Sequence, residues 1–338
     1  MRNYSIDVVT NVIDALLFSD VILNFSTPSE IIAPSLQPYW LLAFIRNYGW
    51  SRKLAVTVVS EDNKPRLIAP LQYATEDTLI FLCDETADYN DFFFDKSNPD
   101  SNLMLSFINY WFSRGIKKIK LDGLPHDSLS LDILQTIAKE KKIGLKVENC
   151  DVMPVVFTQV DKTIDAWEGI RFKWIKGYQR SMRRLNKKAN ILFSLIETEH
   201  ELKAALPVIK EMHIRRWQSH NISSKFLDKR RDSFISEVCK EAVEVNSLFL
   251  PVMKIDGVIA AYHIGFRGGN TIFEWNISFA LEFSKWSPGA LLMLYILSNA
   301  KAWGFSKYNL LRGQEQYKFI WTDKTEQTIS VTVNQSEG

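Results

Sequence analysis

His263 and Glu274 are the side chains in this sequence best suited to accept a proton, because they lie in two neighbouring predicted strands. Alternation along the first strand turns His263 to the face that it shares with Ala261 and Gly265, whose small side chains leave room for a ligand. Either residue could act as a general base if the strands border a cleft. Packing against another element would explain the same pattern, so both interpretations stay open.

A second group of polar side chains follows the predicted strand 306–311. Loops after strands commonly carry ligand-binding groups. Arg312 or Lys318 could bind a phosphate or a carboxylate, and Tyr317 could give a proton to a leaving thiolate. The alternative is an ordinary loop in which Glu315 and Lys318 form a surface ion pair.

Ser287, Pro288 and Gly289 have the pattern of a helix N-terminus. Serine is a common N-cap, proline suits the first helical position, and glycine lets another group approach the backbone. The start of a helix offers free N–H groups and the positive end of the dipole, which suit a pyrophosphate, although many helices begin this way without a ligand. The hypothetical phosphate site comprises Lys285, Ser287, Gly289, Ala290 and Leu291.

The helix predicted over 199–220 carries polar groups on its apolar face, because His213 and Arg216 continue that face at helical spacing, with Trp217 beside them. Buried polar groups need partners. The three residues are therefore either a core histidine with a bracing arginine or a ligand-contacting set at the end of a cleft.

Two segments have a strong charge bias. Residues 84–100 hold six Asp or Glu against one lysine and would repel phosphates, so a phosphorylated donor is expected to bind to the second half. Residues 171–190 hold eight Lys or Arg and no acid. Such a run either binds phosphate, nucleic acid or an acidic partner, or is a solvated helix face.

The two halves repeat one order of elements: hairpin, strand, helix, strand. This order predicts an α/β (α+β) fold with two tandem domains, 1–152 and 153–338, each a mixed, mostly antiparallel sheet flanked by helices. Two unrelated α+β domains are the alternative. The predicted strands are 54–60, 66–73, 78–83, 117–122, 247–254, 258–267, 271–279 and 306–311, and the two repeated helices are 103–114 and 288–303.

Composition limits the class of protein. The chain has 338 residues, a net charge of +2 and 46% apolar residues, which excludes a disordered or collagen-like chain. Cys83, Cys150 and Cys239 are widely separated and indicate free thiols in a reducing compartment and no metal site. Acidic residues interrupt the apolar N-terminal stretch, so we expect no signal peptide and a soluble cytoplasmic protein.

From Phe172 to Trp321 the chain resembles the GNAT acyltransferases, in particular the CelD-like subgroup, whose members look like two GNAT domains in tandem and are related to the Fem-type transferases; the first half agrees more loosely. The matching motifs are His213-x-x-Arg216-Trp217, Ser224-x-Phe226, Ile259-Ala260-Ala261-Tyr262-His263, Ser287-Pro288-Gly289 and Leu311-Arg312-Gly313-x-Glu315-x-Tyr317-Lys318-x-x-Trp321. Two positions depart from the pattern: Asn309 replaces the usual aspartate, and Ser287-Pro288-Gly289-Ala290 stands in place of the common phosphate loop.

The resemblance implies direct acyl transfer, most simply of acetyl, from acyl-CoA to an amine, with no metal and with a first domain that is degenerate. It implies that His263 or Glu274 takes the amine proton, that Tyr317 is the acid, and that a backbone N–H near 274–278 binds the thioester oxygen. The subgroup suggests an amino-sugar acceptor of envelope or polysaccharide biosynthesis. The implied donor-binding residues are Lys285, Ser287, Gly289, Ala290, Leu291, Arg312 and Lys318, and the implied acceptor-binding residues are His213, Arg216, Trp217, Asn276 and Glu315.

Two other functions stay open. A Fem-type transferase would use aminoacyl-tRNA, with the basic run at 171–188 on RNA phosphates. A non-catalytic scaffold on a decayed acyltransferase fold is the other alternative.

Overall fold

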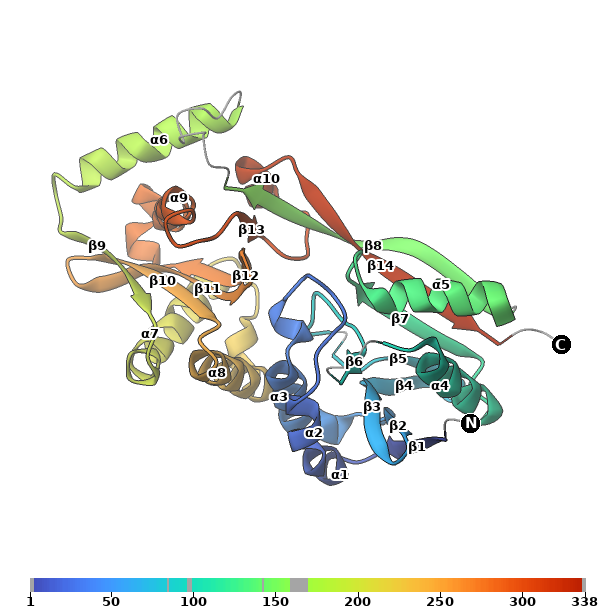
Figure 1. Cartoon of the computed structure of the whole chain (residues 1–338). Helices are drawn as coiled ribbons and strands as arrows, with labels where there is room; N and C mark the ends of the chain where they lie inside the picture. The colour runs from blue at the N-terminus through green and yellow to red at the C-terminus, as the bar shows by residue number, and fades with distance from the viewer. Residues whose placement is uncertain (1–2, 84, 96–98, 142, 159–169, 336–338) are drawn as a thin grey trace. The chain divides into compact units, whose positions relative to one another are not determined.

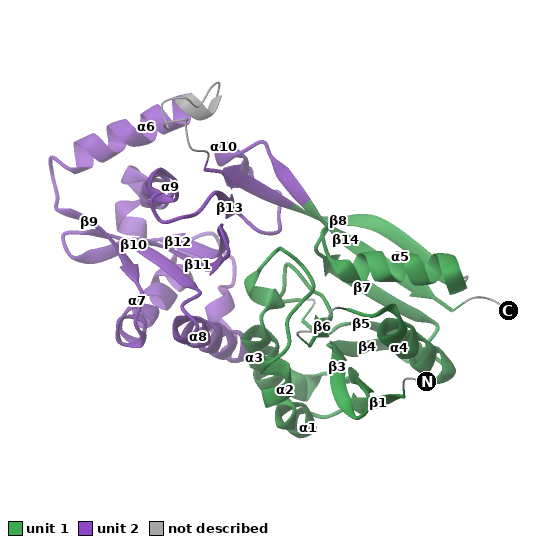
Figure 2. Ribbon diagram, viewed as in Figure 1, with its two compact units in different colours: residues 1–152, 327–338 green, residues 153–326 purple. Residues whose placement is uncertain are grey.

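The computed structural model describes residues 3–83, 85–95, 99–141, 143–158 and 170–335, with only the backbone of 170–172. The chain forms two compact units, residues 1–152 with 327–338 and residues 153–326 (Figure 2). The last strand groups with unit 1, whereas the sequence-based boundary placed it in the second domain.

Unit 1 contains most of its elements in one run of chain (Figure 1). They are β1 (Tyr4–Val9), α1 (Val12–Leu17), α2 (Ser19–Leu23), η1 (Pro34–Leu36), α3 (Pro38–Tyr48), η2 (Gly49–Ser51), β2 (Val56–Glu61), β3 (Lys64–Ala69), β4 (Leu71–Thr75), β5 (Thr78–Phe81), β6 (Phe93–Phe94), α4 (Ser101–Ser113), β7 (Lys118–Leu124) and α5 (Leu129–Lys141). The chain leaves unit 1 through β8 (Gly144–Phe157) and returns through β14 (Thr325–Asn334).

Along the chain, unit 2 comes between β8 and β14. Its elements are α6 (Ile170–Leu185), β9 (Ile191–Ile196), α7 (Glu199–Gln218), η4 (Lys225–Leu227), α8 (Lys229–Glu244), β10 (Leu248–Ile255), β11 (Val258–Gly268), β12 (Thr271–Phe279), η5 (Leu281–Trp286), α9 (Pro288–Asn299), β13 (Lys307–Asn309) and α10 (Gln316–Trp321). Helices α6 and α9 cover one face of its sheet, and α7 and α8 cover the other (Figure 1).

The two units share one sheet topology. In unit 1 the order is β4-β5-β7-β14-β8, beside a smaller sheet β1-β2-β3-β6, and in unit 2 it is β8-β13-β12-β11-β10-β9. In each, an antiparallel pair (β4–β5, β11–β12) is followed by a parallel pair (β5–β7, β12–β13) that one helix joins. The predicted repeat of hairpin, strand, helix and strand is thus present. Strand β14 belongs to unit 1 because it pairs antiparallel with β7.

Local chemistry determined many of these elements. The predicted Asp256-Gly257 turn is confirmed, with φ of 49° and 84°, as a two-residue hairpin requires. The capping box of Thr198 and Glu201 at the start of α7 is also present. The predicted helix 288–303 ends earlier, at Asn299.

The predicted strand 66–73 is wrong as a single element. It divides at Pro70 into β3, which pairs with β2 and β6, and β4, which pairs with β5 in the other sheet. Proline has no N–H for a sheet ladder, so the strand can change sheets there. The Pro70 carbonyl still accepts a hydrogen bond from Leu82 N–H at 2.8 Å.

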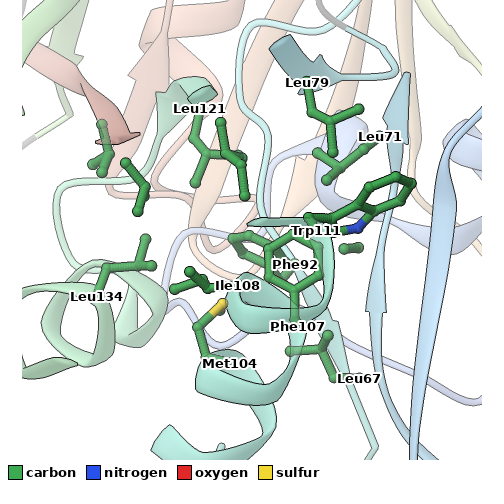
Figure 3. Packing of buried hydrophobic residues seen from close by; sticks show 14 of the residues in the cluster. Leu67, Leu71, Leu79, Phe92, Met104, Phe107, Ile108, Trp111, Leu121 and Leu134 are labelled. Carbon is green, nitrogen blue, oxygen red and sulfur yellow. The ribbon is translucent and has the colours of Figure 1, made fainter. Parts of the chain in front are cut away.

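The core of unit 1 forms around α4. Met104, Phe107, Ile108 and Trp111 recur at helical spacing and pack together with buried strand residues that include Leu71, Leu79 and Leu121 (Figure 3). The Trp111 indole N–H donates to Thr57 Oγ1 at 3.0 Å. The one polar atom of the Trp111 side chain therefore has a hydrogen-bond partner inside this core.

The acidic segment of unit 1 has a buried member. Asp84 and Lys96 lie outside the described residues, but Asp91 is buried and accepts hydrogen bonds from Ser128 Oγ at 2.6 Å and from the Phe92 N–H at 2.7 Å. Burial raises the pKa of Asp91 to about 7, although these hydrogen bonds oppose the shift. Asp91 therefore joins the segment to the start of α5 and does not face a ligand.

Asp91 should make stability depend on pH. The folded state holds a proton that the unfolded carboxyl releases near pH 3.8, so its contribution to the free energy of unfolding is largest below about pH 4, falls as the pH rises to about 7, and is constant above. The loss over this window is about 4 kcal/mol at most. Asp91→Asn should abolish this fall, measured by urea unfolding from pH 4 to 8. The exposed carboxylate variant Asp7→Asn should keep the wild-type slope, and parallel curves for all three proteins would contradict the assignment.

Candidate active site

Strand β12 is longer than its parallel neighbour β13. Pairing runs from Thr271 with Lys307 to Phe273 with Asn309, and β12 then continues to Phe279. Beyond Phe273 the edge of β12 that faces away from β11 has no strand partner among the described residues. A ligand could therefore pair with the backbone on this edge.

A bulge shapes β12 at the point where β13 ends. Ile264 pairs with Asn276 and Gly265 with Glu274, so Trp275 is an extra residue, and its ring packs against Phe266. A Cβ on Gly265 would lie 2.7 Å from the carbonyl oxygen of Phe273, so only glycine fits there.

The Glu274 carboxylate is the centre of a hydrogen-bond cluster whose members are buried except for Tyr317, which is 37% exposed. Its Oε2 accepts from Tyr308 Oη at 2.7 Å and lies 2.9 Å from His263 Nδ1, and its Oε1 accepts from Tyr317 Oη at 3.4 Å. The side chains of His263 and Glu274 are 1% and 2% exposed. The structure therefore brings together all three predicted catalytic residues. Tyr308, which the sequence analysis missed, faces the same way because it pairs with Ile272 in the alternating β12–β13 register.

Both phenols of the cluster are held in the neutral form. Burial, and secondly the Glu274 charge, raise the pKa of Tyr308 and of Tyr317 above the ordinary value near 10. Each phenol can then donate a hydrogen bond to the carboxylate. His263 Nδ1 also lies 3.1 Å from Tyr308 Oη, and its Nε2 is buried without a partner in the described part of the chain.

The loop after β13 depends on a lysine that the sequence analysis assigned to phosphate. Lys318 is buried, and its Nζ donates to the carbonyl oxygens of Leu311 at 3.2 Å and Arg312 at 2.7 Å and lies 3.1 Å from Glu315 Oε2. These three partners give Lys318 and Glu315 a positioning role next to Tyr317. The Arg312 side chain is exposed.

Two further features fix this loop. Leu311 has φ of 55°, and its N–H donates to Asn309 Oδ1 at 2.8 Å. The amide oxygen of Asn309 thus accepts the hydrogen bond that an aspartate carboxylate could accept at this position. Gly313 has φ of 128°, and a Cβ on it would lie 2.3 Å from Glu315 Oε2. The departure at Asn309 therefore leaves the strand end intact.

The N-terminus of α9 is uncapped. Ser287 occupies the N-cap position with φ of 54°, but its side chain makes no capping hydrogen bond. The N–H of Leu291 is bonded to the Ser287 carbonyl and its side chain is in the core, so Gly289 and Ala290 are the residues that can offer free N–H groups. Lys285 Nζ lies 5.4 Å from the ring centroid of Trp286, close to this helix start.

His213 is a structural residue of α7. It is buried, its Nδ1 lies 2.8 Å from Ser224 Oγ, and its ring packs on Trp217 and Phe226. Burial, followed by the charges of Lys225 and Arg216, lowers the pKa of His213 to about 3, so the ring is neutral. His213 and Ser224 thereby join α7 to η4.

Arg216 and Asn276 lie closer to the open edge of β12. The guanidinium carbon of Arg216 is 4.1 Å from the ring centroid of Phe279, and Tyr262 Oη donates to Asn276 Oδ1 at 2.7 Å. Arg216 therefore lies near the end of β12, whereas His213 is buried where α7 meets η4.

Part of unit 2 matches a known family of proteins. Residues 173–319 match the family model described as "Acetyltransferase (GNAT) domain". No curated protein matches the chain by sequence.

Solved structures share the fold over nearly the whole chain. A conserved protein of unknown function from Bacteroides thetaiotaomicron has a TM-score of 0.59 at 12% identity, covering 99% of this chain and 100% of that one. FemX has 0.57 at 10% identity, covering 97% and 96%. The C-terminal domain of a putative lysylphosphatidylglycerol synthetase from Agrobacterium fabrum has 0.55 at 13% identity, covering 97% and 93%. The chain thus has a GNAT-like acyltransferase fold, with mixed sheets flanked by helices.

Two searches of the described residues gave negative results. No helix there is long and apolar enough to cross a bilayer. Nor do the described His, Cys, Asp and Glu residues form a group of three or more that could share a metal ion.

Lys318→Met tests the positioning role. Removing the ammonium leaves two buried carbonyls without their donor, which should lower the free energy of unfolding by about 1–3 kcal/mol in urea. The exposed variant Lys285→Met should change it by less than about 0.5 kcal/mol. If Lys318→Met were as stable as wild type, the ammonium would be free for a ligand and the positioning role would be wrong.

Proposed function

We propose that this protein is an N-acyltransferase that moves an acyl group, most simply acetyl, from acyl-CoA to an amine. The observation that carries the proposal is the Glu274–His263–Tyr308–Tyr317 cluster at the open edge of β12. A buried carboxylate beside an edge of β12 that has no strand partner in the described chain would supply a proton acceptor and backbone donors for a developing oxyanion.

The uncapped start of α9 would hold the donor. Free N–H groups of Gly289 and Ala290 and the positive end of the helix dipole suit a pyrophosphate. Gly289 is part-exposed, and a Cβ there would make only an ordinary contact with Phe279 at 3.6 Å, so small residues leave this helix start open to a ligand.

The proton path follows from the cluster. The amine nitrogen forms a bond to the thioester carbon, the carbon–sulfur bond breaks, and the amine proton passes to Glu274 directly or through water. Tyr317 donates a hydrogen bond to the leaving sulfur. The charge of Glu274 contributes to the raised pKa of Tyr317 and so disfavours a phenolate beside it. Tyr317 therefore gives its proton to the sulfur only while it receives another proton from Glu274. The net result is transfer of one proton from nitrogen to sulfur.

The described strands of unit 1 have no counterpart of this cluster at the matching positions. Matching the parallel pairs β5–β7 and β12–β13 by register places Phe81 at the position of Glu274 and Ile119 at that of Tyr308. Phe81 and Ile119 are both buried in the unit 1 core. We therefore assign catalysis to unit 2 and a non-catalytic role to unit 1.

The acceptor is an amine, and the CelD-like resemblance suggests an amino sugar of envelope or polysaccharide biosynthesis. A non-catalytic scaffold would need no such cluster of four polar groups, three of them buried, so the geometry favours an enzyme. Asn309 does not support the scaffold, since its amide oxygen bonds the Leu311 N–H.

A second candidate is aminoacyl transfer from charged tRNA. Six exposed cations of α6 and the turn after it lie on one stripe at helical spacing: Lys173, Lys176, Arg180, Arg183, Arg184 and Lys187. The opposite face of α6 packs in the core through Ile175 and Leu185, so the stripe faces outward. Such a stripe suits a phosphate backbone.

Thermal melting with acetyl-CoA, longer acyl-CoAs and free CoA tests the donor. A donor at 100 times its dissociation constant should add about 2.7 kcal/mol of stability. Gly289→Glu should lose the shift, because a carboxylate would meet the pyrophosphate, and the uncharged variant Gly289→Gln of similar shape should keep most of it. No shift with any CoA species would contradict the proposal. Salt-dependent binding of charged tRNA would then support the second candidate.

Glu274→Gln should reduce kcat by about 10²–10⁴-fold, because it removes the proton acceptor while keeping the shape. Tyr317→Phe should reduce kcat less and leave KM for the donor nearly unchanged. CoA release with an amine acceptor is the measurement, and Glu282→Gln, an exposed carboxylate of η5, is the control. Full activity of folded Glu274→Gln would rule out the assigned proton path.

A further inference from the structure

Arg216 is a half-buried cation that extends from α7 to the end of β12. Its guanidinium carbon lies 4.1 Å from the centroid of the Phe279 ring, in the segment of β12 that β13 leaves open. Its charge interacts with the phenols of Tyr262 and Tyr317 as well as with the His213 ring, and Tyr317 also donates to Glu274. Arg216 is therefore next to the proposed reaction site.

No acid in the part of the chain that the structure describes forms an ion pair with this charge. Among the described residues the Arg216 guanidinium has neither an ion pair nor a hydrogen-bond acceptor, and its neighbours Tyr262 and Tyr317 are neutral. Burial lowers the pKa of Arg216, which shows the cost of desolvating this charge. The adjacent Arg215 differs: it is exposed and paired with Glu211. A half-buried guanidinium without a counter-ion costs stability unless a ligand supplies the anion.

Two other buried donors near this end of β12 have no acceptor in the described part of the chain. They are the indole Nε1 of Trp217, next to Arg216 in α7, and the hydroxyl of Ser278, which lies opposite Tyr262 in the register and next to Phe279. An oxyanion accepts several hydrogen bonds, so a ligand with such a group could satisfy donors of this kind.

The Phe279 ring against which the guanidinium lies also faces the proposed donor site, because a Cβ on Gly289 at the start of α9 would lie 3.6 Å from it. The charge of Arg216 also acts on Tyr317, which donates to the proposed proton acceptor Glu274, so an acceptor bound by Arg216 would lie near the reacting groups. We propose that Arg216 binds an oxyanion, a carboxylate or a phosphate, of the amine acceptor, so that the acceptor is an acidic amine. The inference rests on the proposed function, which defines donor and acceptor sides.

Arg216→Met and Arg215→Met form a matched pair for the test. Both remove one charge and keep an apolar stem. Melting is measured in acetate, inorganic phosphate and chloride at equal ionic strength. Acetate or phosphate should raise the melting temperature of wild type and Arg215→Met above that in chloride, and this rise should be lost in Arg216→Met. In chloride, Arg216→Met should melt at or above the wild-type temperature, because an unbalanced buried charge is gone.

Three outcomes would overturn the inference. The first is that acetate and phosphate do not raise the melting temperature of wild type, and the second is that they raise that of Arg216→Met equally. The third is a melting temperature of Arg216→Met in chloride well below that of wild type, which would show that Arg216 stabilises the fold.

Acetyl-CoA distinguishes the two sources of the oxyanion. Arg216→Met should keep the acetyl-CoA shift that Gly289→Glu loses. Loss of that shift in Arg216→Met would assign the arginine to donor phosphates and overturn the acceptor assignment. If wild type shows no acetyl-CoA shift, the proposed function fails, whereas the anion series still decides whether Arg216 binds an oxyanion.

Discussion

The buried carboxylate of Glu274 is the group on which the rest of unit 2 depends. A charge with a 2% exposed side chain is tolerated only where donors surround it, and here they come from β11, β13 and α10 through His263, Tyr308 and Tyr317. These three elements must therefore meet at one point on β12. Three features help to bring these elements together: the bulge at Trp275, the glycine at position 265 and the loop held by Lys318.

The early end of β13 has a second consequence. A strand that continued beyond Asn309 would take up the free edge of β12, and no backbone donors would remain beside Glu274. The loop that follows instead turns away through Leu311 and Gly313, both with positive φ, and brings Tyr317 back toward the carboxylate. The proton acceptor and the proposed oxyanion donors thus arise from one interruption of the sheet.

Comparison of the two units shows how one topology supports different roles. Both have a parallel strand pair joined by a helix, but unit 1 fills the position of Glu274 with Phe81. An apolar residue there makes a continuous core and needs no partners. Unit 1 places its buried carboxyl elsewhere, at Asp91, where serine and backbone donors attach a loop to the start of α5. Neither unit can be assigned a function from its topology alone.

The sequence by itself determined the features that depend on local backbone preference: the Asp256-Gly257 turn, the capping box of α7 and the proline-led start of α9. It also identified His263, Glu274 and Tyr317 as residues of interest, because their types are those that move protons. Only the tertiary structure decided which of them meet. The bulge at Trp275 depends on cross-strand pairing, Tyr308 joins the cluster through its register with β12, and Lys318 is held by carbonyls whose directions follow from positive φ angles. Spacing along a chain cannot specify these contacts, because a register or a bulge is set by the strand on the other side.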